Sequence, residues 1–533
     1  MPLKFKTILM LIGGVFYSAF TSAQESPIGW KDFSYIQQSE AWLSTDNAAG
    51  LKYLPVNNIS TANIHIEKRN GKFVNYYESD NSLNSGGNAE SYYRLDPKIV
   101  FYGKVSYNYF TGKNMGGSAF IDPYYNPFDI VQYSDSTRGK KNKETYNLAG
   151  AVSVDIYKGL SLGAKFDYTA ANYAKTKDLR HTNKLMDMYL TVGANYEISR
   201  RVGVGLNYYH RRSTEDLEFN VYGTQDIKYQ SLISYGAFFG KSETFGENGY
   251  TSDKKPMFNQ FNGVALQLNY KLSNKIDLFS EIGYKSRDGY YGLKSSKKIR
   301  YSEHNSDIIE YKGIFSYSNK NYKHILRADI SNEKLVNNET VYRSENQGGG
   351  TTIIVYYDPL KVLSRNTSHV KLEYTGNLGI EDFNPKWTLN AGMEYLHKKQ
   401  TAYLYPFYRK QTIEQTVFNL SAKRNVIKGL NMYTVVLGAV YSTGKGMPQY
   451  EGLYVAPSEG QAVPQVLDQY LNREYEYLTN NQWKGNIGFQ YSRLFKDLRG
   501  YVSVNYSSTK ASNVKYLNGD NLNELYFAVG CTF

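Results

Sequence analysis

Seven histidines and a single cysteine are the residues of this chain best suited to metal binding or nucleophilic chemistry. The histidines are His65, His181, His210, His304, His324, His369 and His397, and no two lie within metal-ligand spacing of each other. Ser368 and His369 are adjacent, but neighbouring residues of a strand point to opposite faces, so they cannot pair there as nucleophile and base. The sequence therefore predicts no enzyme, no metal site and no cofactor.

The segment Asp122–Asp129 brings aromatic rings close to carboxylates. Asp122, Tyr124, Tyr125 and Asp129 could form a platform for a sugar or an aromatic ligand, because rings stack on such ligands while carboxylates accept hydrogen bonds. The other interpretation is a rigid turn that only packs against its own fold, since proline and asparagine favour turns anywhere. The sequence leaves both interpretations open.

Ionisable residues also recur at alternate positions within otherwise apolar runs. Ten of them share the polar face of their predicted strands: Lys104, Lys165, Asp167, Lys271, Glu281, Arg327, Asp329, Lys371, Glu373 and Lys484. Alternation places them on the side away from the apolar residues, so we expect them to line a water-filled interior. They could form a hydrophilic conduit with a slight preference for anions, or they could fill the interior as charge pairs between strands.

The elements that position these side chains follow from strict alternation of apolar and polar residues. Runs such as 99–109, 160–168, 202–208 and 264–272 fit a strand with one apolar face, and a helical period would mix lysines into the apolar stripe. The mean hydropathy is low, at −0.54, although the chain has 53 tyrosines. A membrane barrel explains both values, because only every second residue faces lipid and tyrosine is favoured at the membrane interfaces. We predict an all-β fold with a single transmembrane antiparallel β-barrel of the outer-membrane type, over residues 60–533.

The connections between the predicted strands fall into two classes. Short turns such as 157–159 and 199–201 alternate with long polar connections, which we place at 111–142, 215–260, 286–307, 334–365 and 443–480. Outer-membrane barrels have short periplasmic turns and long extracellular loops, and bacterial single-chain barrels have an even number of strands. We count about 18 strands, within a range of 16–20.

The N-terminal residues predict export. Lys4 and Lys6 precede an apolar run, and Ala23 ends a pattern of small residues, so we expect residues 1–23 to be a signal peptide of a Gram-negative cell. Residues 24–59 are then a periplasmic or lumen-inserted segment. They are too few for the separate plug domain of a TonB-dependent receptor, so we expect no energy-coupled import by this chain alone.

The last nine residues alternate and end on an aromatic side chain. Phe527, Val529 and Phe533 share the apolar face, and this pattern is typical of the final strand that the barrel assembly machinery reads. Cys531 is the only cysteine, which excludes an intrachain disulfide. The formal charge of +13 favours contact with outer-membrane lipid and lipopolysaccharide, or an anion-tolerant lumen, over nucleic acid. Solvated lysines on long loops explain this charge equally well.

Two segments carry a resemblance to known barrels. Ser44–Leu51 (STDNAAGL) precedes the first predicted strand, and Asp122–Phe128 (DPYYNPF) follows the third. Together they resemble a family of outer-membrane β-barrels of unknown function from Bacteroidota, over nearly the whole chain. Asp46, Asn47 and Gly50 belong to the first segment, which is also similar to the Asn-Pro-Ala segment of long-chain fatty-acid transporter barrels, although Ala48 replaces the proline. The resemblance implies the location and the fold, but no substrate.

Three functional hypotheses follow. The first is an outer-membrane barrel that passes, or helps to pass, a small solute through a polar lumen. The second is a closed barrel that acts at the surface as a ligand-binding or scaffold subunit, beside a TonB-dependent receptor or a surface lipoprotein. The third is a transporter of a hydrophobic ligand, which would need an apolar pocket in the lumen.

Overall fold

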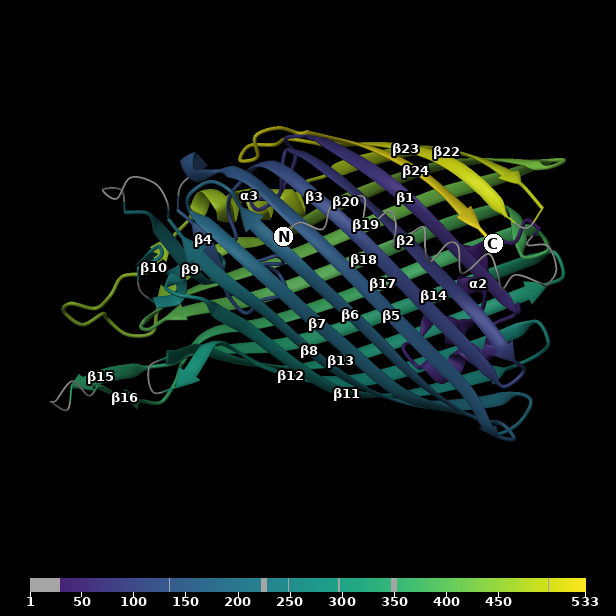
Figure 1. Cartoon of the computed structure of the whole chain (residues 1–533). Coiled ribbons are helices and arrows are strands. Elements are labelled where there is room, and N and C mark those ends of the chain that lie inside the picture. The colour runs from purple at the N-terminus through teal and green to yellow at the C-terminus, as the bar shows by residue number, and fades with distance from the viewer. Residues whose placement is uncertain are drawn as a thin grey trace.

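The alternating runs of the sequence form one closed wall of strands. The computed structural model describes residues 29–533, apart from 134, 222–227, 248, 296–297, 347–351 and 497. Within that part of the chain, 18 strands form a single antiparallel sheet that closes on itself (Figure 1). The wall consists of β1 (Asn58–Gly71), β2 (Asn81–Asp96), β3 (Ile99–Met115), β5 (Gly139–Tyr157), β6 (Leu160–Lys175), β7 (Arg180–Glu197), β8 (Val202–Asn220), β11 (Lys255–Lys271), β12 (Ile276–Ser295), β13 (Lys298–Asn319), β14 (Tyr322–Glu339), β17 (Leu360–Glu381), β18 (Asn384–Leu404), β19 (Phe407–Lys428), β20 (Asn431–Leu453), β22 (Gln482–Leu494), β23 (Arg499–Ala511) and β24 (Asn521–Thr532).

The first and last strands close the barrel. β1 pairs with β24 in an antiparallel register that sets Ile64 opposite Val529 and Ile66 opposite Phe527. Beyond the last paired residues, the main chains of Ser60 and Phe533 exchange two hydrogen bonds, at 2.7 and 3.0 Å. No sheet edge is left in the wall, so the backbone groups of each strand are paired with a neighbour inside the membrane. The predicted all-β fold, the single barrel and the strand count are confirmed.

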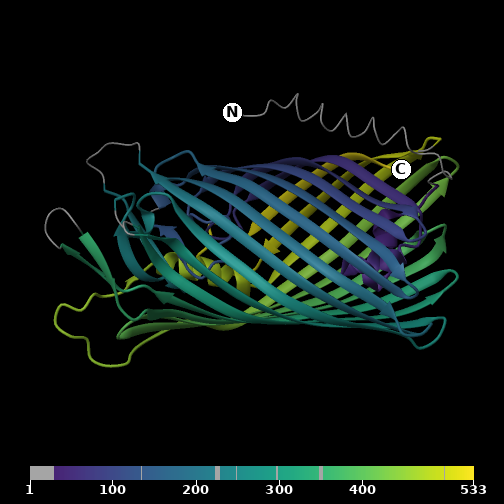
Figure 2. The ribbon, with the colours of Figure 1, turned by 60° about the horizontal axis from the view of Figure 1, so that its bottom comes forward.

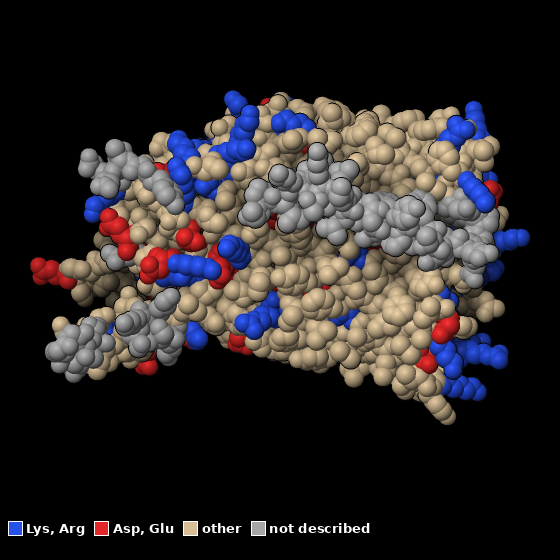
Figure 3. Space-filling model, in the orientation of Figure 1, with Lys and Arg blue, Asp and Glu red and all other residues tan. Residues whose placement is uncertain are grey.

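Apolar side chains cover the outside of the wall. Val105, Leu266 and Leu420 point outward and keep 54%, 59% and 64% of their surface exposed, which in water would be unfavourable but suits hydrocarbon. Figure 3 shows the charged side chains concentrated toward the two ends of the barrel, with a broad and mostly uncharged band between them. No helix in the described ranges is long and apolar enough to cross a membrane.

The two ends of the barrel differ in the length of their connections. Turns such as those between β5 and β6 or between β19 and β20 lie at one end, here called the short-turn end. The connections from β3 to β5, β8 to β11, β14 to β17 and β20 to β22 lie at the other, the long-loop end. The predicted long loop at 286–307 is wrong, because β12 runs to Ser295 and β13 begins at Lys298. These strands continue above the hydrocarbon, where the outer face meets water, the inner face packs against the inserted elements, and the apolar alternation disappears.

Further elements lie within the wall or project from its ends. The chain from Trp30 to Leu54, here called the N-terminal segment, contains α2 and two short 3₁₀-helices, and it lies inside the short-turn end (Figure 2, purple). A four-stranded sheet, here called the mouth sheet, and the helix α3 lie at the long-loop end. The bounds are α2 (Phe33–Ser39), η1 (Ala41–Ser44), η2 (Ala48–Tyr53), β4 (Asp129–Gln132), β9 (Gln230–Gly236), β10 (Phe239–Thr244), β21 (Gln465–Val466), α3 (Asp468–Thr479), η3 (Asp135–Thr137), η4 (Gly249–Thr251) and the hairpin β15 (Tyr342–Asn346) with β16 (Thr352–Tyr356).

Candidate functional site

Polar side chains cap the starts of two of the three helical turns of the N-terminal segment, α2 and η2. Asp32 Oδ1 accepts a hydrogen bond from the main-chain nitrogen of Tyr35 at 3.0 Å and so starts α2. Asn47 Oδ1 accepts one from Ala49 at the same distance and starts η2. The apolar side of these turns packs on the inner wall, where Ile36 is fully buried against residues of β1, β2 and β3. The segment therefore has a defined shape inside the lumen.

Cations of the wall bind the main chain of this segment. A carbonyl oxygen carries a partial negative charge, so a buried lysine or arginine that reaches one is hydrogen-bonded without needing an acidic partner. Four wall residues on four different strands bind in this way: Arg94 donates to the carbonyls of Lys52 and Leu54, Lys312 to that of Ser44, Lys323 to that of Ser39, and Arg499 to those of Trp30 and Lys31. The contacts come from β2, β13, β14 and β23, so they approach the segment from around the barrel.

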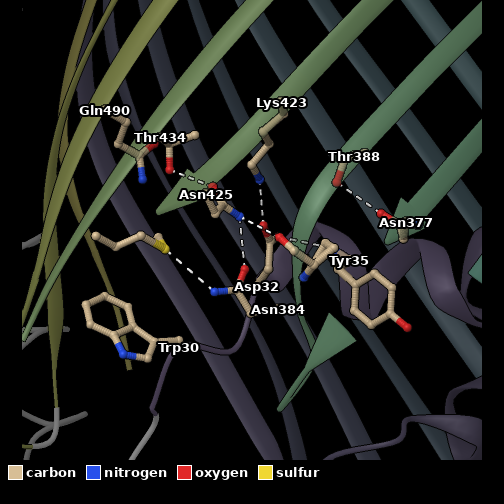
Figure 4. Close-up of polar contacts among 12 residues, drawn as sticks. Trp30, Asp32, Tyr35, Asn377, Asn384, Thr388, Lys423, Asn425, Thr434 and Gln490 are labelled. Carbon is tan, nitrogen blue, oxygen red and sulfur yellow. Dashed lines mark hydrogen bonds and ion pairs between the residues drawn. The ribbon is translucent and has the colours of Figure 1, made fainter. Parts of the chain in front are cut away.

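Ion pairs between wall lysines and carboxylates of the segment add to these contacts. Lys165 Nζ lies 3.0 Å from Asp46 Oδ1, and Lys423 Nζ lies 2.6 Å from Asp32 Oδ2. Figure 4 shows the second pair: Lys423 reaches down from β19 to Asp32, beside a chain of amide contacts through Asn425 and Asn384. A third pair joins Lys323 of β14 to Glu40 at 3.8 Å, so the carboxylates of the segment are held on three strands, β6, β14 and β19.

The predicted motif residues Asp46, Asn47 and Gly50 lie at the closest approach of the segment to the wall. Asn47 Nδ2 donates to the carbonyl of Ala194 at 2.9 Å and to Gln267 Oε1 at 2.7 Å. A Cβ atom on Gly50 would lie 2.9 Å from that of Trp42, so the fold of the segment itself requires a glycine there. The motif is a docking element between the segment and the wall strands β6, β7 and β11.

A second layer fills the long-loop end. The mouth sheet packs an apolar core against the wall in which Ile233, Tyr235 and Phe239 are buried. Arg409, only 1% exposed, joins the wall to these inserted elements, because Nη1 donates to the carbonyl of Ala237 at 3.1 Å and to Asp468 of α3 at 2.9 Å. The lumen of the described chain is therefore occupied by packed protein at two levels.

The predicted ligand loop belongs to this second layer. Asp122 Oδ1 accepts hydrogen bonds from the main chain of Tyr124 and Tyr125, which closes the turn. The guanidinium of Arg287 stacks 4.4 Å from the ring centre of Tyr125 and donates to its carbonyl. Asp129 is buried in β4, accepts hydrogen bonds from Ser118 and Tyr76, and has a pKa raised by burial to about 6. The structure thus uses these four residues in the packing of the loop.

A small cavity lies beside that loop. It has a volume of about 50 Å³, enough for one or two water molecules. Tyr124, Phe238, Arg365, Lys398 and Glu474 are among the residues that line it. Its lining mixes rings with charged groups, and Lys398 pairs with Glu474 across 3.4 Å.

The ten ionisable positions predicted to line the interior lie on the inner face of the wall. Some contact the segment or neighbouring strands: Lys165 pairs with Asp46, Asp167 accepts from Asn147, Glu281 from Gln267, Lys371 lies 3.3 Å from Glu373, and Lys484 pairs with Glu524. In the register, Lys104 faces Glu90, Lys271 faces Asp277, Arg327 faces Glu373 and Asp329 faces Lys371. Lys371 and Glu373 each keep about a third of their side-chain surface accessible, which indicates a water-filled space between the two packed layers.

The sequence prediction did not identify the cations that hold the segment. Lys312 and Lys323 follow the same alternation as Lys371, so their inward direction was readable from the sequence. Their target is a main-chain carbonyl on a segment more than 250 residues away, which no local pattern encodes. Among the described residues, no group of three His, Cys, Asp or Glu side chains could hold a metal ion.

A closed, lipid-facing wall of 18 antiparallel strands defines a β-barrel of the outer-membrane type. The sequence identifies its family: the chain belongs to the family described as a family of unknown function (DUF6850), whose model matches residues 48–533. A comparison with curated proteins gave no match.

Solved structures with a similar fold are outer-membrane proteins of low identity. The ferric yersiniabactin uptake receptor FyuA from Yersinia pestis has a TM-score of 0.43 and 8% identity, over 89% of this chain and 80% of that one. BauA, the ferric preacinetobactin receptor from Acinetobacter baumannii, has a TM-score of 0.40 and 9% identity, over 89% and 79%. A FadL homologue from Pseudomonas aeruginosa has a TM-score of 0.32 and 10% identity, over 92% of each chain.

Proposed function

We propose that this chain is an outer-membrane barrel that passes a small polar solute and is closed by its N-terminal segment until that segment moves. The short-turn end faces the periplasm and the long loops face the cell surface, as the asymmetry of outer-membrane barrels implies. Passage is by diffusion, and the chain supplies neither energy coupling nor catalysis. The origin in a Bacteroidota species and the cleaved signal peptide stay predictions.

The observation that carries this proposal is the construction of the N-terminal segment. It fills the short-turn half of the lumen and contributes no strand to the wall, whose 18 strands begin at Asn58. Its displacement therefore breaks side-chain contacts and the main-chain hydrogen bond from Asp32 to Phe383 in the turn between β17 and β18, but no ladder hydrogen bond of the barrel. A gated conduit requires a blocking element of this kind, which can leave the lumen while the wall stays closed.

The charges in the lumen support an anionic solute. Arg94, Lys312 and Arg499 bind carbonyl oxygens of the segment while it is in place. Once the segment moves, these cations face water, and the open path carries more positive than negative charge. A lumen of that kind raises the local concentration of anions.

The alternative is a closed surface barrel that binds a ligand or serves as a scaffold beside a TonB-dependent receptor or a surface lipoprotein. The apolar core beneath the mouth sheet favours it, because Ile233 and Tyr235 are completely buried there and would have to leave that core for a path to form. The hypothesis of a hydrophobic ligand gains less support, since Arg365, Lys398 and Glu474 line the small cavity at this level.

Conductance in planar bilayers tests the proposal. We expect the wild-type protein to be closed for most of the time, and the triple variant Lys312→Gln, Lys323→Gln, Arg499→Gln to open frequently in discrete steps. Hydrogen bonds to charged groups contribute about 1.5–3 kcal/mol each. Losing three of them should therefore shift the equilibrium between the closed and the open state by orders of magnitude. Deleting residues 30–54 should open the short-turn end permanently and give anion-selective conductance that only the mouth sheet still limits.

The matched control is the pair Lys371→Gln, Lys484→Gln, which removes lumen cations that contact only the wall. This control should stay closed like the wild type. Silence of both the triple variant and the deletion, in protein that still migrates as a folded barrel, would reject gated passage and favour the closed surface barrel.

A further inference from the structure

Four tyrosines form a continuous aromatic surface outside the lumen. Tyr403, Tyr408, Tyr450 and Tyr454, here called the tyrosine platform, come from β18, β19, β20 and the residue that follows β20. Tyr454 lies between two of the others, with its ring centre 4.8 Å from that of Tyr408 and 6.4 Å from that of Tyr403. Tyr408 and Tyr450 are 6.3 Å apart.

The register sets the platform on the outer face of the wall. Lys398 and Gln400 of β18, and Arg409 and Gln411 of β19, are buried in the lumen against the inserted elements. Residues that alternate with them point outward, so Tyr403 and Tyr408, which are paired across the strands, share the outer face. More than half of the surface of Tyr450 and of Tyr454 is exposed. The wall here extends beyond the inserted sheet and continues into the loop at the lower left of Figure 2.

The platform lies above the hydrocarbon. Phe418 is the nearest outward apolar side chain on β19, and Tyr408 lies ten residues further toward the long-loop end. At about 3.3 Å per residue and a tilt of about 40°, this is about 25 Å along the membrane normal. An aromatic interface girdle ends well below that height, so anchoring in lipid does not explain these rings.

Lysines accompany the rings. Lys361 Nζ lies 5.6 Å from the ring centre of Tyr403, and Lys410 Nζ lies 5.0 Å from that of Tyr408 and 5.9 Å from that of Tyr450. The nearest outward carboxylate on β19, Glu414, lies 3.5 Å from Lys445. Gly452 faces Tyr408, and a Cβ atom there would overlap the phenol ring, so the glycine lets that ring lie flat on the wall. The surface is aromatic and basic, with the ring of Tyr408 tilted by 37° against that of Tyr450 and by 44° against that of Tyr454.

We propose that the tyrosine platform binds the phosphorylated core saccharide of a glycolipid in the same membrane. Aromatic faces attract the polarised C–H groups of sugar rings, and lysines attract phosphate. The platform faces sideways over the surrounding lipid, where a membrane-anchored saccharide stands beside the wall at this height, whereas a partner from solution meets the loops first. This inference rests on the proposed outer-membrane location and orientation.

Binding in lipid nanodiscs tests the platform. Wild-type protein in phosphatidylcholine nanodiscs is titrated with lipopolysaccharide that carries a complete phosphorylated core, and separately with lipid A alone, with occupancy read by native mass spectrometry. We expect the core-bearing form to bind about tenfold more tightly, as expected from a few exposed aromatic and cationic contacts. The variant Tyr450→Ser, Tyr454→Ser, Lys361→Gln, Lys410→Gln should bind both forms equally.

A matched control lies on another face of the wall. Tyr107 and Tyr146 are also paired outward, with ring centres 5.0 Å apart, and the exposed Lys113 and Lys140 follow them toward the long-loop end. The variant Tyr107→Ser, Tyr146→Ser, Lys113→Gln, Lys140→Gln should keep the wild-type preference. Equal loss in both variants, or no preference for the core in the wild type, would overturn the proposal.

Two further measurements separate the sources of failure. Soluble core oligosaccharide that binds as tightly as the anchored form would replace the membrane glycolipid by a soluble glycan and overturn the assignment. Nanodiscs expose both ends of the barrel, so the result does not depend on orientation in the cell. A negative binding result together with normal gating of the lumen variants would reject only the platform.

Discussion

Two glycines in the wall determine how closely the N-terminal segment can approach it. Gly163 on β6 and Gly193 on β7 face the lumen where the segment crosses at Asn47–Ala49. A Cβ atom on Gly163 would overlap the main chain of Ala48 and Ala49, and one on Gly193 would overlap the amide of Asn47. The main chain of the segment cannot yield by rotating a side chain, so position 163 requires the smallest residue, whereas at Gly193 the overlap is with the side chain of Asn47.

Gly163→Ala should therefore loosen the segment without disturbing the barrel. Overpacking of this kind costs about 1–3 kcal/mol, which would fall on the segment because it is not hydrogen-bonded into the wall ladder. We expect faster proteolysis within residues 30–54 and more frequent opening in bilayers. Gly103→Ala and Gly150→Ala are controls, since a Cβ atom at either position has no neighbour within 4 Å. Equal proteolysis in Gly163→Ala and in the controls would contradict this account.

For single residues, the sequence predicted the side of the strand to which a side chain points but not the residue that it contacts. Alternation placed Lys104, Lys165 and Lys371 toward the interior because a strand has a period of two, and the structure has them there. It did not predict that Lys165 meets Asp46, since that contact joins residues 119 positions apart. Such contacts depend on the packing of a segment whose own sequence has no strand pattern.

Among the elements, the mouth sheet contains a buried carboxyl that should respond to pH. Asp129 on β4 has a pKa of about 6 in the folded protein, above its ordinary value of 3.8, because burial disfavours the charged form. A raised pKa means that the folded state holds its proton more tightly than the unfolded state. The stability that this group contributes is therefore full below about pH 3.8 and is lost as the pH rises through about 6.

We expect the amides of β4 to exchange faster at pH 7.5 than at pH 5, after correction for the intrinsic rate. Asp129→Asn keeps an uncharged side chain at both pH values, so this variant should show a smaller difference between them, by about 1.4 kcal/mol in opening free energy. Hydrogen exchange followed by mass spectrometry measures the effect. An identical pH dependence in the variant and the wild type would assign it to other groups.

The strand ends show where sequence reasoning about elements fails. The long connection predicted at 286–307 is strand over 286–295 and 298–307, where Asp288 pairs with Asn305 and Tyr290 with Glu303. Strand pairing depends on backbone hydrogen bonds, whereas apolar alternation reports only the part of the strand that touches lipid. The membrane-spanning part of each hairpin is thus readable from sequence, and its extension into water is not.

For the whole molecule, the closing pair of strands is the feature with a testable consequence. Phe533 is joined to Ser60 by two main-chain hydrogen bonds, so its side chain is not needed for the pairing itself. We expect Phe533→Asp to lower the amount of assembled barrel in the outer membrane, because the terminal aromatic residue belongs to the predicted assembly signal. Heat-modifiable migration of outer-membrane fractions measures this amount.

Phe495→Asp is the control for that experiment, since Phe495 is an exposed phenylalanine that follows β22 at a short turn, outside the terminal strand. Normal amounts of assembled Phe533→Asp would show that the terminal side chain carries no signal. An equal loss in both variants would point to the general cost of an added charge.

The barrel as a whole was predictable because the alternation of apolar and polar residues is repeated from strand to strand. Closure, strand number and the lipid-facing surface all follow from alternation and from the pairing of neighbouring hairpins. The contents of the lumen were not predictable, since the mouth sheet joins β4, β9, β10 and β21 from three different connections. Short strands such as β21, with two residues, carry no pattern of their own.

The hydrogen bonds from wall cations to main-chain carbonyl oxygens determine which residues of the N-terminal segment can vary within this family. Every amino acid has the same main-chain carbonyl, so Lys312 and Arg499 recognise the path of the backbone and do not depend on the side chains of the segment. Substitutions in the N-terminal segment should therefore cost little binding to the wall as long as its capping and docking residues are kept. The wall cations are thus the constrained side of this contact, and most of the sequence of the N-terminal segment is free to change.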